Sequence, residues 1–146
     1  MNEPAPSVRL PDRGDVLEVC VQTPRGSFWK RDDFGRRSLP SPFPVPFNYG
    51  FVPGWPSADG DQLDALLLGS RVERGGKRTG TVLGVVAFRD QGVPDPKVIL
   101  RDRPGTRLAA WERRTFELFF HLYGGIKRGL RPGRPSGFEG WIVPPA

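Results

Sequence analysis

Two short apolar runs, each bordered by aspartates, constrain the fold of this chain most strongly. Residues 65–68 (ALLL) and 81–88 (TVLGVVAF) are apolar on both faces, as strands are when a sheet is covered on both sides. Residues 98–100 (VIL) resume the same character after a turn. With 19 Gly and 17 Pro among 146 residues, we expect short strands joined by turns and irregular loops rather than many helices.

The turn before the first run is acidic. It reads DGDQLD and carries the carboxylates of Asp59, Asp61 and Asp64. Carboxylates this close repel one another unless water solvates them or a cation bridges them, and Mg²⁺ prefers such oxygen ligands. A solvated polar turn is the alternative, because Asp-Gly pairs commonly form turns. An EF-hand does not fit, because no Glu follows before Glu73.

A second acidic corner follows the longer run. Asp90 stands at the expected strand end, Asp95 on the turn, and Lys97 at the start of the next strand. A second group of carboxylates with a cation, again beside a strand end, makes a plain polar turn a weaker explanation of the first group. The alternative is a surface hairpin with ordinary turn aspartates.

One helix is expected, near the end of the chain. Thr106 follows a Pro-Gly pair and is a suitable N-cap, and Gly124-Gly125 is expected to end the helix. We expect one apolar face to pack against the strands, with Tyr123 near the site and His121 exposed or packed rather than catalytic. The residues at helical spacing are Leu108, Trp111, Thr115, Phe116, Phe119, Phe120 and Tyr123.

The first strand is expected to be half-buried. Residues 16–21 alternate between apolar and polar positions, which places Gln22 on the more polar face. Residues 38–46 are extended and interrupted by proline, and residues 139–141 of the Gly/Pro-rich tail are expected to dock back onto the body. The pattern predicts one domain, residues 1–146, with a flexible segment at 1–14. Its class is mainly β (α+β), a small β-barrel with a C-terminal amphipathic helix.

Charge and cysteine content indicate which partners and which cellular compartment to expect. The net charge of +6 raises either nucleic acid or an anionic small molecule as a partner, and many cations stand singly in loops. The single cysteine, Cys20, excludes an internal disulfide and favours the cytoplasm. We expect no membrane span and no signal peptide, since no apolar segment is long enough for a span and the start lacks an apolar core.

The order of these motifs resembles the family I soluble inorganic pyrophosphatases. The motifs are PRGSFWK at 24–30, Arg37, NYGF at 48–51, DGDQLD, the corner from Asp90 to Lys97, FFHLY at 119–123 and EGW at 139–141. The resemblance runs from about residue 19 to residue 141. It implies a closed five-stranded OB-like barrel with a flanking helix, hydrolysis of pyrophosphate by metal-activated water, and a homo-oligomer. It implies two or more Mg²⁺ ions, with Mn²⁺, Co²⁺ or Zn²⁺ as substitutes.

The resemblance also implies roles for individual residues. Asp61 would orient and deprotonate the attacking water near Tyr49, the tyrosine of NYG, and Asp32 stands where the family has an acidic residue. The implied metal ligands are Asp59, Asp64, Asp90 and Asp95. The implied phosphate contacts are Lys30, Arg37, Lys97 and Tyr123.

The edges of the site depart from the family pattern. Gln22 replaces a usual glutamate, Val45 a usual tyrosine, and Gly124 a usual lysine. Lys127 could reach the site from further along, although the expected helix end precedes it. The segment between Lys30 and Arg37 is also shorter than usual.

Two alternatives to the enzyme stay open. A degenerate paralogue would bind phosphate compounds with weak or no turnover, which the altered edges favour. A basic OB-like nucleic-acid binder is disfavoured, because five aspartates would repel a phosphate backbone in the absence of metal. We expect no membrane partner and no nucleic-acid partner.

Overall fold

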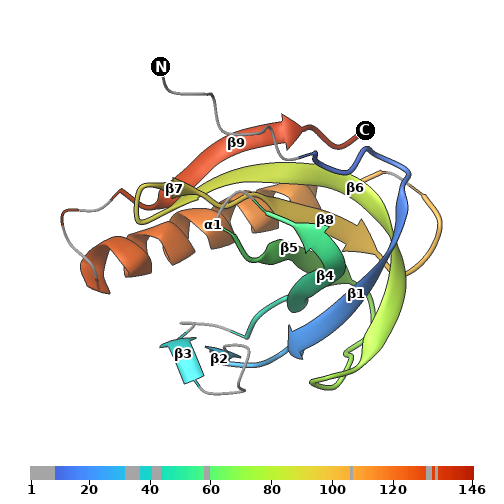
Figure 1. Ribbon diagram of the computed structural model, residues 1–146, viewed down its shortest axis with the longest axis horizontal. Helices are drawn as coiled ribbons and strands as arrows, with labels where there is room; N and C mark the ends of the chain where they lie inside the picture. Colours follow the sequence, from blue (N-terminus) through green and yellow to red (C-terminus); the bar gives the residue numbers. More distant parts are fainter. Residues whose placement is uncertain are drawn as a thin grey trace.

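A closed five-stranded barrel forms the body of the protein (Figure 1). The computed structural model describes residues 9–31, 37–40, 44–57, 60–105, 107–130, 133 and 135–146. In barrel order the strands are β1 (Val16–Thr23), β4 (Asn48–Pro56), β5 (Gln62–Leu68), β8 (Lys97–Arg101) and β6 (Lys77–Asp90), and β6 pairs with β1 to close the ring. Only β5 and β8 are parallel among these pairs. The predicted closed OB-like barrel is confirmed.

Short strands extend this body. β9 (Gly137–Val143) pairs with β6, and its Trp141 lies opposite Val86, so the predicted docking of the tail is confirmed. β2 (Trp29–Arg31) and β3 (Arg37–Pro40) pair with each other as a separate hairpin. β7 (Val93–Pro94) turns back on the end of β6 through Gln91 and Gly92, whose φ angles of 53° and 85° match the two-residue turn that joins tightly paired strands.

Both faces of the barrel wall are covered, which explains the uniformly apolar runs. In β5, Leu63, Ala65 and Leu67 point into the barrel interior, whereas Leu66 faces the helix. The alternation predicted for β1 is confirmed, since Val19 and Val21 are buried. The interior cluster comprises Val19, Val52, Leu63, Ala65, Leu67, Val82, Val85, Val98 and Leu100.

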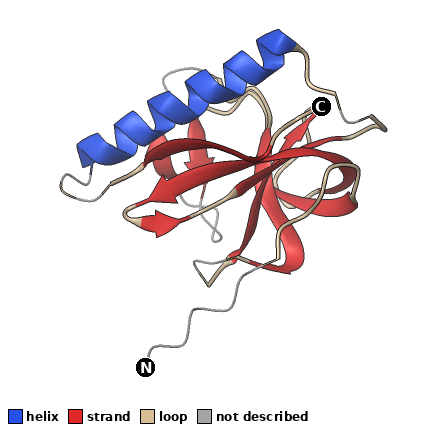
Figure 2. Cartoon of the chain, turned by 90° about the horizontal axis from the view of Figure 1, so that it is seen from above, coloured by secondary structure: helices blue, strands red, loops and turns tan. Residues whose placement is uncertain are grey.

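The helix α1 (Ala110–Leu130) lies along one side of the barrel (Figure 2). Its Phe116 and Phe119 pack on Phe47 with ring centroids 5.3 and 4.8 Å apart. The predicted apolar face is thus confirmed at its centre. It is wrong for Trp111, which is 71% exposed, and for Thr115, which is also exposed. At about 100° per residue, Trp111 lies roughly 140° around the helix from Phe116.

The bounds of the helix differ from the prediction at both ends. The helix begins at Ala110, and Thr106 lies outside the described residues. Glu112 accepts a hydrogen bond of 3.0 Å from the Ala109 amide, as the acidic member of a capping box does. The helix continues through Gly124-Gly125, so the predicted end there is wrong. A β-carbon at Gly124 would lie 2.8 Å from the Cα of Gly137; this glycine permits close packing of β9 rather than a helix stop.

The N-terminal segment meets the barrel over its described part, residues 9–14. Trp55 Nε1 donates to the Arg9 carbonyl at 2.8 Å, and the Gly14 amide donates to the Val82 carbonyl at 2.9 Å. Residues 1–8 lie outside the described residues. In the part of the chain that the structure describes, no helix is long and apolar enough to cross a membrane.

Candidate active site

A buried lysine joins two carboxylates at one end of the barrel. Lys97 opens β8 and lies beside Asp64 of β5 in the parallel register. Its Nζ atom is 2.5 Å from Asp64 Oδ2 and 2.7 Å from Asp95 Oδ2, and its side chain is 1% exposed. Two carboxylates on one ammonium leave this group with a net charge of −1 within a largely buried region.

The charge on Lys97 is stabilised by its surroundings. Burial by itself lowers the pKa of Lys97, because a low dielectric disfavours the charged form. The groups around it outweigh burial and hold the pKa of Lys97 well above its usual range. In decreasing order of effect, these groups are Asp64, Tyr49, Asp95 and Tyr123. The lysine therefore stays cationic at neutral pH.

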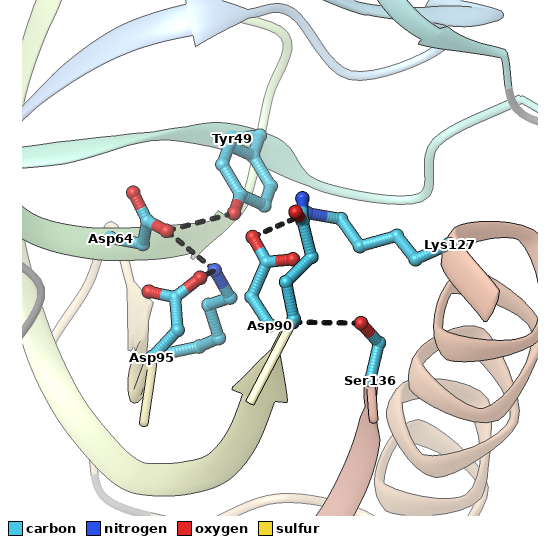
Figure 3. A network of polar contacts seen from close by, with 8 residues as sticks. Tyr49, Asp64, Asp90, Asp95, Lys127 and Ser136 are labelled. Carbon is cyan, nitrogen blue, oxygen red and sulfur yellow. Dashed lines mark hydrogen bonds and ion pairs between the residues drawn. The ribbon is translucent and has the colours of Figure 1, made fainter. Parts of the chain in front are cut away.

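Tyr49 fixes the orientation of one of these carboxylates. It lies on β4, next to β5, and is 3% exposed. Its hydroxyl donates to Asp64 Oδ2 at 3.2 Å (Figure 3). Lys97 contacts the same oxygen. Two donors on Oδ2 fix the direction in which the other oxygen of Asp64 points.

A second lysine–carboxylate pair joins the helix to the end of β6. Lys127 Nζ is 2.6 Å from Asp90 Oδ2, with side chains 15% and 26% exposed. Figure 3 shows Lys127 extending from the helix toward Asp90. The same ammonium lies 5.0 Å from the centroid of the Tyr123 ring, and that ring packs on Phe88 at 5.5 Å.

The backbone beside Asp90 is also fixed. The Gln91 amide donates to Ser136 Oγ at 2.9 Å, and Ser136 is 5% exposed. The Asp95 amide donates to the Phe88 carbonyl at 2.8 Å, which ties the turn to β6. Sequence reasoning missed Ser136, because nothing in the sequence connects a tail serine to this turn.

The remaining predicted residues lie on other elements of the barrel or beyond the described part. Asp61 is exposed on the turn before β5, where its carbonyl accepts from the Ser57 amide at 2.8 Å. Gln22 of β1 lines a hollow of about 420 Å³ together with Gln62 and Arg74. Lys30 and Arg37 lie on the β2–β3 hairpin, whose backbone alone is described; Asp32 and Asp59 lie outside the described residues.

The chemistry of the oxygen atoms fits a divalent cation. Asp90 Oδ1 is buried and has no hydrogen-bond partner among the described residues, so a ligand for this oxygen would remove a desolvation cost. Carboxylate oxygens suit hard cations such as Mg²⁺. Within the described ranges, no three carboxylates are grouped closely enough to hold an ion by themselves. Asp59, a fourth implied ligand, lies outside those ranges.

The fold and the site define an OB-like barrel with acidic and basic groups paired at one end, a combination suited to a cation and a polyanion together. The family model described as inorganic pyrophosphatase matches residues 30–124, more than half of the chain. The chain therefore belongs to the inorganic pyrophosphatase family.

Individual relatives agree with this. The chain is 33% identical over 143 residues to the inorganic pyrophosphatase of Sulfolobus acidocaldarius, covering 87% of this chain and 82% of that protein. It is 32% identical over 146 residues to the Mesorhizobium japonicum inorganic pyrophosphatase, covering 92% and 77%. The crystal structure of the Thermus thermophilus inorganic pyrophosphatase is 28% identical, with a TM-score of 0.73 and coverage of 92% and 87%.

Proposed function

We propose that this protein hydrolyses inorganic pyrophosphate to two orthophosphates and that it needs Mg²⁺ to do so. Family membership supports the reaction, and one observation carries the proposal for this chain. Acceptor oxygens for a cation and ammonium groups for a polyanion lie together, as Asp64 and Asp95 around Lys97 and as Asp90 beside Lys127. A compact polyanion whose cleavage adds charge needs both kinds of group.

The proposed metal ligands are Asp59, Asp64, Asp90 and Asp95, with two or more ions per site. When bound, Mg²⁺ supplies charge neutralisation and lowers the pKa of bound water. Mn²⁺, Co²⁺ and Zn²⁺ are proposed substitutes. The orphaned buried oxygen of Asp90 is the feature of this chain that supports a cation there.

The side chains of the protein carry the remaining steps. Asp61, exposed on its turn, is proposed to take the proton from the attacking water. Tyr49 keeps Asp64 in place through their hydrogen bond. Lys97 holds Asp64 and Asp95 together. Its ammonium is also proposed to attract a phosphoryl oxygen of the bound substrate. The other proposed phosphate contacts are Lys30, Arg37 and Tyr123, with Asp32 and Gln22 at the edge of the site.

The test is release of phosphate from pyrophosphate by purified protein with Mg²⁺, Mn²⁺, Co²⁺ or Zn²⁺, and with a chelator. We expect release that requires metal and stops with the chelator. Asp64→Asn protein purified in the same way controls for a contaminating pyrophosphatase and is expected to release far less. No release with any of the four metals would reject the enzyme and favour the phosphate-binding paralogue. Binding of single-stranded DNA at moderate salt would favour the nucleic-acid alternative.

We also propose a cytoplasmic homo-oligomer that has no membrane or nucleic-acid partner. The single cysteine supports a reducing compartment. Large apolar side chains on the outer face of the helix support self-association: Trp111, Leu118 and Leu122 are 71%, 59% and 40% exposed. Sedimentation velocity measures the assembly, and a monomer at micromolar concentration would contradict it.

A further inference from the structure

Lys127 is placed on the site by the unbroken course of the helix. It lies four residues after Tyr123 and therefore on the same helical face, with its ammonium 5.0 Å from the centroid of that ring. Position 124 can carry a side chain only if β9 shifts, because a β-carbon there would lie 2.8 Å from Gly137 Cα and 3.4 Å from Gly137 N. In this packing, the cation at this corner is therefore supplied by Lys127 and not by position 124.

The two lysines of the site differ in how firmly they are held. Lys97 is 1% exposed and contacts two carboxylates, so moving it would remove the cation that Asp64 and Asp95 share. Lys127 is 15% exposed and is paired with Asp90 alone in the described part of the chain. Its flexible four-carbon stem leaves the ammonium able to leave Asp90 while remaining at the site.

Asp90 can accept a different cation without moving. Its turn is anchored by the Gln91–Ser136 hydrogen bond, and its Oδ1 atom is buried without a hydrogen bond within the described residues. A divalent cation on this carboxylate would repel the ammonium and satisfy the orphaned oxygen as well. The displaced ammonium would then lie beside the position of a metal-bound polyanion.

We propose that Lys127 alternates between two partners: Asp90 when the site is empty, and a phosphoryl oxygen of pyrophosphate or of product phosphate when a divalent cation occupies Asp90. The inference rests on the proposed function and deepens it by assigning this lysine as a substrate-binding residue. Two opposite consequences follow for its removal. The cation loses a competitor and binds more tightly, whereas the anion loses a ligand and binds more weakly.

The experiment compares Lys127→Met with Lys127→Arg and with Lys77→Met. Met keeps most of the unbranched stem of the side chain without its charge, and Arg preserves the charge. Lys77 is a matched control, because its ammonium lies 3.9 Å from Glu18 on an exposed surface. Calorimetry measures Mg²⁺ binding to metal-free protein without substrate, and initial rates at saturating Mg²⁺ give KM, kcat and inhibition by phosphate. Thermal unfolding confirms that each variant is folded.

We expect Lys127→Met to lower the dissociation constant for Mg²⁺ by about threefold to tenfold, because no ammonium competes for Asp90. We expect the same variant to raise KM and the phosphate inhibition constant by about tenfold, because roughly one charge-assisted contact to the anion is lost. Lys127→Arg should recover most of the anion binding, and Lys77→Met should match the wild type. Unchanged constants in Lys127→Met would overturn the inference. So would weaker binding of cation and anion together, since that is the result of a merely structural role.

The two proposals fail in different ways. If the wild type hydrolyses pyrophosphate and Lys127→Met behaves like Lys77→Met, only the role of Lys127 is rejected. If the wild type binds Mg²⁺ but releases no phosphate, the proposed hydrolysis is rejected, while tighter Mg²⁺ binding by Lys127→Met still supports the competition at Asp90. If the wild type binds no divalent cation, both proposals are rejected.

Discussion

Gly124 of the helix and Gly137 of β9 approach so closely that a β-carbon on Gly124 would lie 2.8 Å from Gly137 Cα. Beside this contact, Arg128 Nη1 donates to the Ser136 carbonyl at 2.7 Å. The helix and the start of β9 are therefore held against each other by a backbone contact and by the Arg128 side chain. This packing positions both the Lys127 ammonium and the Ser136 hydroxyl at the turn that carries Asp90.

The contact predicts that Gly124→Ala destabilises the protein by about 1–3 kcal/mol through overpacking, although alanine favours a helix over glycine by about 1 kcal/mol. Gly125→Ala is the matched control. Its β-carbon would meet only the flexible Arg128 guanidinium at 3.7 Å, and we expect it to stabilise by up to about 1 kcal/mol. Denaturant unfolding measures both. Equal effects of the two variants would show that β9 yields at no cost, and a lysine at position 124 would then be tolerated.

Removal of the Lys97 ammonium is expected to be severe. Lys97→Met leaves Asp64 and Asp95 without their shared cation in a buried region, at a cost of about 3–5 kcal/mol. Adding Asp95→Asn to this variant should recover part of the loss, because one of the two carboxylate charges that shared the missing cation is removed. Lys77→Met, which breaks only an exposed pair at 3.9 Å, should change the free energy of unfolding by less than about 0.5 kcal/mol. Denaturant unfolding in metal-free buffer measures the free energy of unfolding of each variant. A Lys97→Met protein as stable as the wild type would contradict the prediction.

The proposed separation of base and metal ligand predicts two different kinetic defects. Asp61→Asn should lower kcat by roughly two to four powers of ten with little change in the Mg²⁺ dependence, because the amide cannot take a proton. Asp90→Asn should instead raise the Mg²⁺ concentration needed for half-maximal rate. Titrations of Mg²⁺ at saturating pyrophosphate measure both quantities. The same loss in both variants at saturating metal would remove the distinction between the two roles.

Much of the fold could be predicted from local patterns. The alternation at residues 16–21 and the apolar runs at 65–68 and 81–88 have the periods of half-buried and fully covered strands, and those strands are present. The position of Asp90 at a strand end and of Lys97 at a strand start depended only on where apolar character stops and resumes. These features are set within a few residues and can be read without knowing the tertiary contacts.

The helix ends and the lysine pairs could not be read in this way. A glycine pair is an ordinary helix stop, and only the approach of β9 shows why Gly124 lies within the helix. Lys97 meets Asp64 because β5 and β8 are parallel neighbours, and 33 residues separate the two in sequence. For Lys127 and Asp90, the one available signal was the i, i+4 spacing of Lys127 from Tyr123, which places both on one helical face. That signal was not used, because the helix was expected to end before Lys127.

Acid is expected to weaken the contact between the helix and β9 through one carboxylate. Trp141 Nε1 donates to Glu117 Oε1 at 3.1 Å, and Arg113 Nε lies 3.1 Å from the same oxygen. The Trp141 hydrogen bond, with Arg113, lowers the pKa of Glu117 from its ordinary value of 4.5. A carboxyl whose pKa is lowered by folding contributes stability that is present above its unfolded pKa and is lost as the pH falls through the folded pKa.

Glu117→Gln should therefore be less stable than the wild type at pH 7, and the difference should shrink below about pH 4.5. Trp141→Phe removes this donor and should show the same convergence. The amide oxygen that Glu117→Gln introduces can still accept from Trp141, so this substitution removes the charge rather than the bond. The double variant should lose less stability than the sum of the two single losses, because the two residues are in contact. Unfolding free energies followed by circular dichroism at pH 7 and in acid measure this, and a difference that stays constant with pH would assign the effect of Glu117→Gln to packing instead of charge.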